Sequence, residues 1–254
     1  MQLTILGVGS SAGTPMLGCS CDTCISTDPR NNRTRCSSLI ELDSGKVLLI
    51  DTGPDLRFQS LRENLTHIDA VLYTHTHADH LHGIDDLRGF CQIQRSQIPL
   101  YGSHEAMAHI ADKFSYTLRE PSDFWDLPVL KVNPINEPFE LFSQTIIPIP
   151  LKHGNHFIYG YRIGDIAYLT DVSSIPESSL LLLQGLKLLL LDCLRYKTHF
   201  THINLEQSLH YASLIKAQST YLIHMTHDLE YNLLSASLPP NVYVGYDGLK
   251  LKVN

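Results

Sequence analysis

Short apolar segments that end in polar or glycine-containing turns recur along this chain. Segments of about four to six residues with alternating or continuous apolar positions are typical of β-strands. Two pairs of these segments flank Asp43-Ser44-Gly45 and Gly164-Asp165, which predict β-hairpins. The predicted strands cover residues 3–6, 38–42, 46–50, 70–73, 145–150, 159–163, 166–169, 187–191, 220–223 and 249–253.

Helical spacing of apolar residues is confined to a few places. It predicts helices at 105–116, just after Pro176, and at 204–216. Residues 119–138 hold four Pro and the only Trp, and are expected to form an irregular covering segment. Strands thus alternate with helices, and polar residues repeatedly follow strand ends, where α/β folds place their chemistry.

The composition suits a soluble globular protein of one large or two small domains. The chain has 254 residues, 43% apolar and 18% charged, which excludes collagen-like, disordered and coiled-coil proteins. Gln184, Gly185 and Lys187 interrupt the longest apolar stretch, and residues 1–7 lack the charged region of a secretory signal. We expect a cytoplasmic location without a membrane partner. In that compartment the six Cys are metal ligands or core residues rather than disulfides.

Charge and histidine content narrow the function. The formal net charge is −7 and no cluster of Lys or Arg occurs, which argues against a stable nucleic-acid complex. A small anionic substrate stays open. The chain has 14 His against 19 Lys and Arg together, an excess that folding does not require. Some of these histidines are therefore candidates for a functional site.

A dense group of potential metal ligands follows the predicted strand at 70–73. His75, His77, Asp79 and His80 fall within six positions. A segment this short can turn two ligands toward one ion and two toward a neighbouring one, which suits a two-metal site. Any one of these histidines alone would be typical of a solvated loop. His82 falls outside the spacing and is expected at the surface or behind the ligands.

This motif resembles the His-x-His-x-Asp-His signature of the metallo-β-lactamase superfamily, which also follows a strand. The other pieces of that family occur in order: a strand-end Asp-x-Gly at Asp51, metal histidines at His153 and His224, and a bridging aspartate at Asp171. The resemblance covers almost the whole chain. It implies an α/β fold in one domain, residues 1–254, built as an αββα sandwich of two mixed β-sheets flanked by helices.

The resemblance also assigns the ligands and two divalent catalytic metal ions. One ion would be held by His75, His77 and His153, the other by Asp79, His80 and His224, with Asp171 and a water or hydroxide as bridges. Asp79 is counted among the catalytic residues as well, and Asp51 is expected behind the ligands. Nitrogen and oxygen donors of this kind admit Zn, Mn, Fe or Ni.

A second cluster lies near the start of the chain. Cys19, Cys21 and Cys24 place three thiols within six residues, which suggests a closed structural zinc site that lacks one ligand. His227 is the candidate for the fourth ligand. We expect a structural zinc loop at about residues 18–36, and the alternative is three reduced cysteines beneath a loop. Cys36, Cys91 and Cys193 have no ligand spacing and are expected in the core.

This insertion resembles the branch that contains the phosphoribosyl 1,2-cyclic phosphate phosphodiesterase of the carbon-phosphorus lyase pathway. The segment around His202 and the Asp-Gly at Asp247 also resemble that branch. The resemblance implies hydrolysis of a small, cyclic ribose or nucleotide phosphodiester by a hydroxide bridging the two ions. His202 is the candidate general acid, because imidazole can hold a proton near neutrality; its alternative role is phosphate anchoring. A homodimer is expected by analogy only.

Weaker candidates and other functions stay open. Arg88 could clamp a phosphate, or could pair with Asp85 or Asp86. Asp192 and Asp247 are candidates for supporting a ligand or contacting substrate. A transfer-RNA 3′-processing nuclease and a glyoxalase II-like thioesterase or lactonase share the metal motifs, although no basic RNA-gripping arm occurs in the sequence. A non-catalytic metal-binding module would take up metal without turnover.

Overall fold

Two seven-stranded sheets face each other in the computed structural model, which describes residues 1–119 and 129–253. The first sheet has the order β14-β1-β2-β3-β4-β5-β6. Its strands are β14 (Lys250–Lys252), β1 (Gln2–Gly7), β2 (Ser37–Glu41), β3 (Val47–Ile50), β4 (Ala70–Leu72), β5 (Ile98–Gly102) and β6 (Leu130–Pro134). Strands β3 to β6 run parallel and the others antiparallel, so the sheet is mixed.

The second sheet has the order β13-β12-β11-β10-β9-β8-β7 and is also mixed. Strands β10 to β13 are parallel, and β7 to β10 form an antiparallel meander. Its strands are β13 (Val242–Val244), β12 (Ser219–Ile223), β11 (Leu188–Asp192), β10 (Ile166–Leu169), β9 (His156–Ile163), β8 (Gln144–His153) and β7 (Phe139–Leu141).

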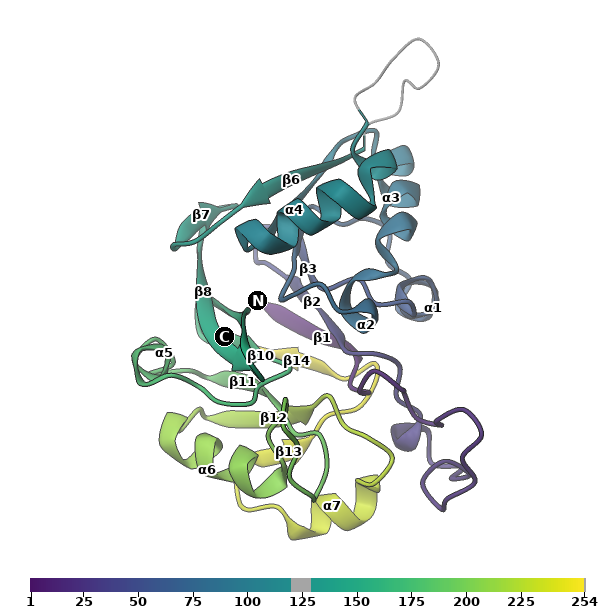
Figure 1. Cartoon of the computed structure of the whole chain (residues 1–254), viewed down its shortest axis with the longest axis vertical. Coiled ribbons are helices and arrows are strands. Elements are labelled where there is room, and N and C mark those ends of the chain that lie inside the picture. Colours follow the sequence, from purple (N-terminus) through teal and green to yellow (C-terminus); the bar gives the residue numbers. More distant parts are fainter. Residues whose placement is uncertain (120–128, 254) are drawn as a thin grey trace.

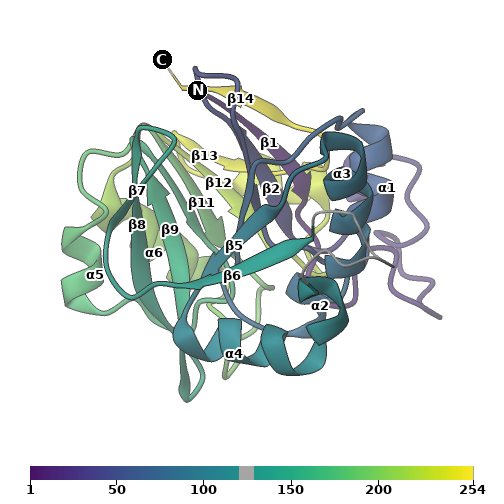
Figure 2. The same cartoon turned by 90° about the horizontal axis from the view of Figure 1, so that it is seen from above.

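Helices cover the outer faces of the two sheets. Figure 2 shows α1 and α3 on one outer side and α5 and α6 on the other. The helices are α1 (Leu56–Arg62), α2 (Ala78–Leu81), α3 (Leu87–Gln94), α4 (His104–Lys113), α5 (Glu177–Leu181), α6 (Leu205–Ile215) and α7 (Tyr231–Ser237). Short 3-10 turns occur at Pro29–Asn31, Ile84–Asp86 and Ser115–Leu118.

Three buried apolar clusters hold these layers together. The central cluster joins inner faces of both sheets, as between Ile40 of β2 and Tyr168 of β10. A second cluster packs the first sheet against α1 to α4, and a third packs the second sheet against α5 and α6. Burial of these apolar faces is the main favourable contribution to folding. The αββα sandwich expected from the sequence is therefore confirmed.

Both predicted hairpins are present, but the segment before β7 differs from its prediction. Ser38 pairs with Ile50 between β2 and β3, and Ile166 pairs with Ile163 between β9 and β10. Within the expected irregular segment 119–138, Leu130–Pro134 forms β6, which pairs parallel to β5. Proline is tolerated there because β6 lies at the sheet edge. The remainder of that expectation, residues 120–128, lies outside the described residues.

The two ends of the described chain meet beside the first sheet. The amino group of Met1 donates to the carbonyl of Val253 at 3.1 Å, and β1 pairs with β14. Figure 1 shows the two ends close together. Among the described residues, no helix combines the length and apolar character needed to cross a membrane.

Candidate metal centre

The candidate ligands come from segments far apart in the chain that meet at one edge of the sandwich. His75 and His77 follow β4, and Asp79 and His80 lie in α2, directly after them. His153 ends β8, Asp171 follows β10, and His224 follows β12. Because parallel strands place their carboxyl ends at the same edge, the order of strands alone gathers these residues.

Three residues of this edge have a backbone conformation that non-glycine residues rarely adopt. The φ angles of Asp51, Asp171 and His224 are 61°, 57° and 58°. Asp51 and His224 directly follow a strand, and Asp171 is the second residue after β10, so the left-handed conformation turns the chain sharply at these strand ends. Such strain costs of order 1 to 3 kcal/mol per residue and clusters at functional sites. This conformation is not evident in the sequence.

The ligand atoms form two groups that share one carboxylate. In each group the candidate ligand atoms lie within 4.8 Å of one another. Oδ1 of Asp171 is 3.1 Å from Nε2 of His80 and 3.3 Å from Nε2 of His224. Its Oδ2 is 3.7 Å from Nε2 of His75. The first group is His75, His77, His153 and Asp171, and the second is Asp79, His80, Asp171 and His224.

The donor set fits divalent metal ions. Nε2 of His75, His80 and His224 is buried and has no hydrogen-bond partner among the described residues. A buried polar atom without a partner costs free energy, and coordination of a cation would remove that cost. Three or four imidazole and carboxylate ligands per group are typical of catalytic transition-metal sites. Each group could therefore hold one ion, with Asp171 between the two.

Neighbouring polar groups orient the candidate ligands. The carboxylate of Asp51 accepts hydrogen bonds from Nδ1 of His80 at 2.7 Å and from the backbone and hydroxyl of Thr74 at 2.8 and 2.7 Å. Nδ1 of His153 donates to the carbonyl of Thr201 at 2.9 Å. In both rings Nε2 is then the nitrogen left to face the centre. Asp51 thus lies where the sequence predicted it, behind a ligand.

Electrostatics of the protein alone already favour a cation at the centre. Burial lowers the pKa of His75 well below its ordinary value, so this ring is neutral, as a ligand must be. Burial also opposes charge on His80, but the nearby carboxylates of Asp171 and Asp51 raise its pKa well above the ordinary value. Burial would raise the pKa of Asp171, yet the surrounding imidazoles hold it well below its usual range. The Asp171 carboxylate therefore remains anionic in the interior, where a divalent ion can take the place of protons.

His202 lies against the same centre and is positioned by Asp192. Nδ1 of His202 is 3.2 Å from Oδ2 of Asp192, and its Nε2 is 3.8 Å from Oδ2 of Asp171. Its ring stacks on that of His224, with ring centres 4.8 Å apart and planes at 11°. Asp192 also accepts from the backbone of Val172 at 2.8 Å, which fixes the carboxylate. His202 therefore presents Nε2 toward the two groups.

A third grouping, Asp192 with His202 and His224, also lies within 4.8 Å. Nδ1 of His224 is 3.6 Å from Oδ1 of Asp192, and Nδ1 of His202 faces the other oxygen. These contacts between the carboxylate and the far side of each ring account for the grouping. They support the two rings rather than define a third metal site.

The cysteine loop and the segment after β12 meet away from this centre. Nδ1 of His227 is 3.1 Å from Sγ of Cys21 and 3.4 Å from Sγ of Cys19. All four candidate ligand atoms, including Sγ of Cys24, lie within 4.8 Å of one another. Three thiols and one imidazole at this spacing suit tetrahedral zinc. Figure 1 shows this loop extending from the body of the molecule.

The structure places the weaker candidates in supporting roles. Arg88 donates to the Asp85 carboxylate at 2.9 Å, the contact expected under the pairing alternative. Asp247 accepts from the backbones of Val8 at 3.0 Å and Thr34 at 2.9 Å, and belongs to neither metal group. Asp247 therefore joins the last turn of the chain to its beginning.

Some features of the site are not indicated by any motif in the sequence. The Thr74 hydroxyl lies 3.0 Å from Nδ1 of His75, and the Thr201 carbonyl accepts a hydrogen bond from His153. Ser103, Glu105 and His156 line a cavity beside His75. His156 belongs to the same turn as His153, and this proximity was the one available hint. Cys36, Cys91 and Cys193 are buried, as expected, and His82 is exposed.

Comparison with known proteins identifies relatives along the whole chain. A Beta-lactamase superfamily domain matches residues 46–225. The octanoyltransferase of Porphyromonas gingivalis is 37% identical over 254 residues, 98% of this chain and 51% of that protein. Coenzyme PQQ synthesis protein B of Methylorubrum populi is 28% identical over 165 residues, 60% of this chain and 53% of that protein. The chain thus spans about half the length of these curated relatives.

Solved structures give the same family. A diphosphatase from the PhnP family is 42% identical, with a TM-score of 0.93 over 100% of this chain and 98% of the other. Zn²⁺-bound PqqB from Methylobacterium extorquens is 21% identical, with a TM-score of 0.80 over 100% of both chains, and shares the fold. Because a family domain matches residues 46–225 and a 42% identical structure shares the fold, the chain belongs to the metallo-β-lactamase superfamily of hydrolases, in the branch of the PhnP-family diphosphatase.

Proposed function

We propose that this protein is a metal-dependent phosphodiesterase that holds two divalent ions and hydrolyses a small anionic phosphodiester. The observation that carries the proposal is the Asp171 carboxylate, which lies between two groups of imidazoles and 3.8 Å from His202. When bound, two such ions would lower the pKa of a water molecule and neutralise charge on the phosphate oxygens. The 42% identical diphosphatase supports phosphorus chemistry at this site.

The chain's own residues supply position and a proton. His202 would face the leaving oxygen with Nε2, since Asp192 occupies the side of Nδ1. As the oxygen of water forms a new bond to phosphorus, the bond to the ester oxygen breaks, and His202 donates a proton to that oxygen. Asp192 would hold the ring in place and stabilise its protonated form, as carboxylates paired with catalytic histidines do. The products are an alcohol and a phosphomonoester, and a cyclic phosphodiester gives one phosphomonoester that carries the freed hydroxyl.

The donor set of each group admits Zn, Mn, Fe or Ni, and the cysteine cluster would hold one further zinc. We propose His75, His77 and His153 for the first ion and Asp79, His80 and His224 for the second, with Asp171 shared. The single domain, the cytoplasmic location and the homodimer stay predictions.

One relative favours a second candidate. The octanoyltransferase of P. gingivalis is named for acyl chemistry, and this chain matches about half of it. A thioesterase acting on an acyl group would use the same ions to polarise a carbonyl. His202 would then have a lesser part, because a thiolate leaves without prior protonation.

A substrate panel separates the two candidates. The metal-loaded protein would be offered ribose 1,2-cyclic phosphate, a nucleoside 2′,3′-cyclic phosphate, diadenosine diphosphate and octanoyl coenzyme A. We expect kcat/KM to be highest for one of the two cyclic phosphodiesters, and Asp171→Asn to abolish that turnover together with part of the metal content. Turnover of the thioester alone would overturn the proposed phosphodiesterase.

A further inference from the structure

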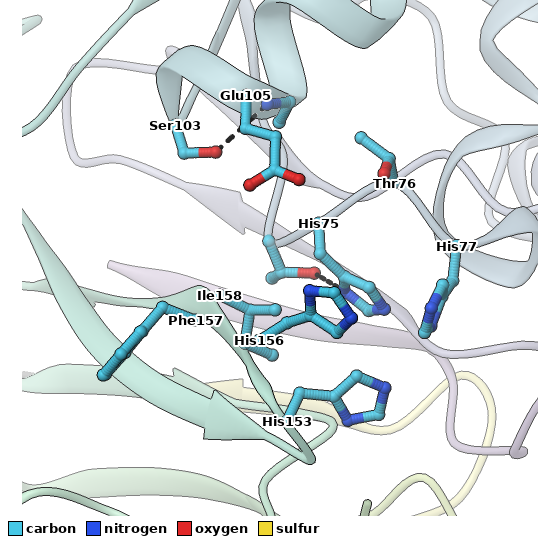
Figure 3. A pocket seen from close by; sticks show the side chains of 11 residues that line it. His75, Thr76, His77, Ser103, Glu105, His153, His156, Phe157 and Ile158 are labelled. Carbon is cyan, nitrogen blue, oxygen red and sulfur yellow. Dashed lines mark hydrogen bonds between the residues drawn. The ribbon is translucent and has the colours of Figure 1, made fainter.

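A cavity adjoins the first metal group and has no part in the mechanism above. Its volume is about 150 Å³, several times the ~30 Å³ share of a water molecule in the liquid. His75, His77 and His153 line one side of it, and Ser103 and Glu105 at the start of α4 line another. Figure 3 shows the Glu105 carboxylate directed from the helix toward the imidazole rings. A substrate whose phosphate lies at the ions can extend directly into this space.

The start of β9 completes the cavity. His156 and Phe157 both line it, and Phe157 is 65% exposed although it is a large apolar side chain. Figure 3 shows the His156 ring among the candidate ligand rings, with the side chain of Phe157 farther out. An exposed aromatic ring beside a polar cavity can cover the apolar face of a ligand.

The described lining of the cavity includes an acidic side chain and no Lys or Arg. Among the described residues that line it, Glu105 is the one carboxylate, and none is Lys or Arg. Glu105 is exposed and forms neither a hydrogen bond nor an ion pair within the described parts of the chain. The nearest cation of the hairpin, Lys152, has Nζ 5.9 Å from the centre of the Phe157 ring and does not line the cavity. A second anionic group placed beside Glu105 would meet a carboxylate, and no Lys or Arg side chain among the described lining residues offsets it.

The hydrogen-bonding groups suit hydroxyls. The Glu105 carboxylate can accept hydrogen bonds from them, and the Ser103 hydroxyl, which accepts from the backbone of Ala106 at 3.1 Å, can still donate. The lining therefore suits an uncharged group that carries several hydroxyls.

We propose that this cavity binds an uncharged, hydroxyl-bearing part of the substrate, such as an unphosphorylated ribose, and that Glu105 disfavours substrates with a second phosphate on that part. The inference rests on the proposed phosphodiesterase and specifies its substrate class. Glu105 acts here as a specificity determinant and takes no part in bond cleavage. Like charges opposed across a binding site discriminate strongly between ligands.

Two substrates that differ by one phosphate test the proposal. The metal-loaded protein would be assayed with ribose 1,2-cyclic phosphate and with 5-phosphoribose 1,2-cyclic phosphate. We expect kcat/KM to be about tenfold or more higher for the first, mainly through KM, because the additional charge opposes Glu105. Glu105→Gln should bring the two values to within about threefold of each other, with metal content unchanged. Glu177→Gln, an exposed carboxylate in the first turn of α5, is the matched control and should keep the wild-type ratio.

The outcomes are distinct. Equal kcat/KM for the two substrates in the wild-type protein, or an unchanged ratio in Glu105→Gln, would overturn the assignment of the cavity and leave the phosphodiesterase intact. Hydrolysis of neither substrate, at full metal loading, would overturn the proposed function and this inference with it.

Discussion

At the scale of single residues, two carboxylates have different roles at the centre. Asp171 faces inward, with one oxygen toward each group of imidazoles. Asp192 lies behind the centre and contacts the far nitrogens of His202 and His224. A carboxylate in the first position holds charge between two cations, and one in the second fixes the tautomer and orientation of the rings. The chemistry therefore depends on residues that differ in position rather than in type.

His202 should matter most when the leaving group is poor. We expect His202→Ala to lower kcat on an alkyl phosphodiester by about 10²- to 10⁴-fold, the usual contribution of a general acid. On a p-nitrophenyl phosphodiester, whose leaving oxygen needs no proton, the loss should be much smaller. Metal analysis before the assay controls for lost ions. Equal losses on both esters at full metal occupancy would point to phosphate anchoring instead.

Asp247 should make the stability of the fold depend on pH. Burial raises the pKa of its carboxyl to about 6, although hydrogen bonds from Thr34 and a contact with Arg62 oppose this shift. Between the ordinary pKa of about 4 and this raised value, the folded chain holds a proton that the unfolded chain releases, so the contribution of Asp247 to stability is largest below about pH 4 and is lost as pH rises to about 6. A shift of two pKa units corresponds to up to about 3 kcal/mol.

Comparison with Asp247→Asn isolates that contribution, since other titrating groups are common to both proteins. We expect the difference in free energy of unfolding between wild type and variant to change between pH 4 and 6 and to stay constant above pH 7. Denaturant unfolding at each pH measures it. A difference that is flat across this range would show that the carboxyl is already ionised at pH 4.

At the scale of elements, Arg33 joins the cysteine loop to the segment after β12. Its backbone pairs with Thr14, which closes the loop at its base. Its side chain is buried and donates to the carbonyls of Thr226 and Leu229, on either side of His227. These contacts bring the histidine to the three thiols. A zinc ion bound there would hold together segments about 200 residues apart in the chain.

Loss of one cysteine should therefore affect stability and metal content together. We expect Cys21→Ala to bind one zinc fewer per chain and to melt at a lower temperature, because metal affinity contributes to folding at such sites. Asp22→Asn, an exposed neighbour in the same loop, is the matched control and should behave as wild type. Metal analysis and thermal unfolding measure the two effects. Wild-type zinc content and melting temperature in Cys21→Ala would contradict the zinc loop.

The elements also show what sequence patterns can predict. Long alternating or apolar segments such as β2, β3 and β10 were predictable because their flanking turns contain glycine. Strand β6 was not, since Pro134 and its prolyl neighbours indicate irregular structure until pairing with β5 is known. Helix α1 was also missed, because its apolar positions give little helical periodicity. Such elements are determined by the sheets against which they pack.

The candidate site likewise combines features that the sequence predicts with features that it does not. The ligands at 75–80, His153, Asp171 and His224 were recognisable because the motif and its partners occur in a fixed order. Their geometry, including the left-handed φ of Asp171 and His224, follows from strand order and was not predictable locally. The cavity around Glu105 combines the start of α4 with the start of β9, two segments without a shared motif.

At the scale of the whole molecule, the sandwich explains how an acidic protein could receive an anionic substrate. The formal charge is −7, and the described residues lining the cavity include no Lys or Arg. Positive charge at the bottom of the site would come from divalent ions held where the edges of two sheets meet. Each ligand group combines residues from both sheets, because His75 and His80 follow a strand of the first sheet and Asp171 follows a strand of the second.

The most direct test of this account follows phosphodiester hydrolysis while a divalent metal is returned to metal-depleted protein. Ribose 1,2-cyclic phosphate is the substrate, and ³¹P NMR detects the phosphomonoester. We predict that turnover is absent without metal and rises to saturation at two ions per chain beyond the zinc of the cysteine loop. Turnover that stays absent at every metal loading, in a protein that has bound all three ions, would contradict the account.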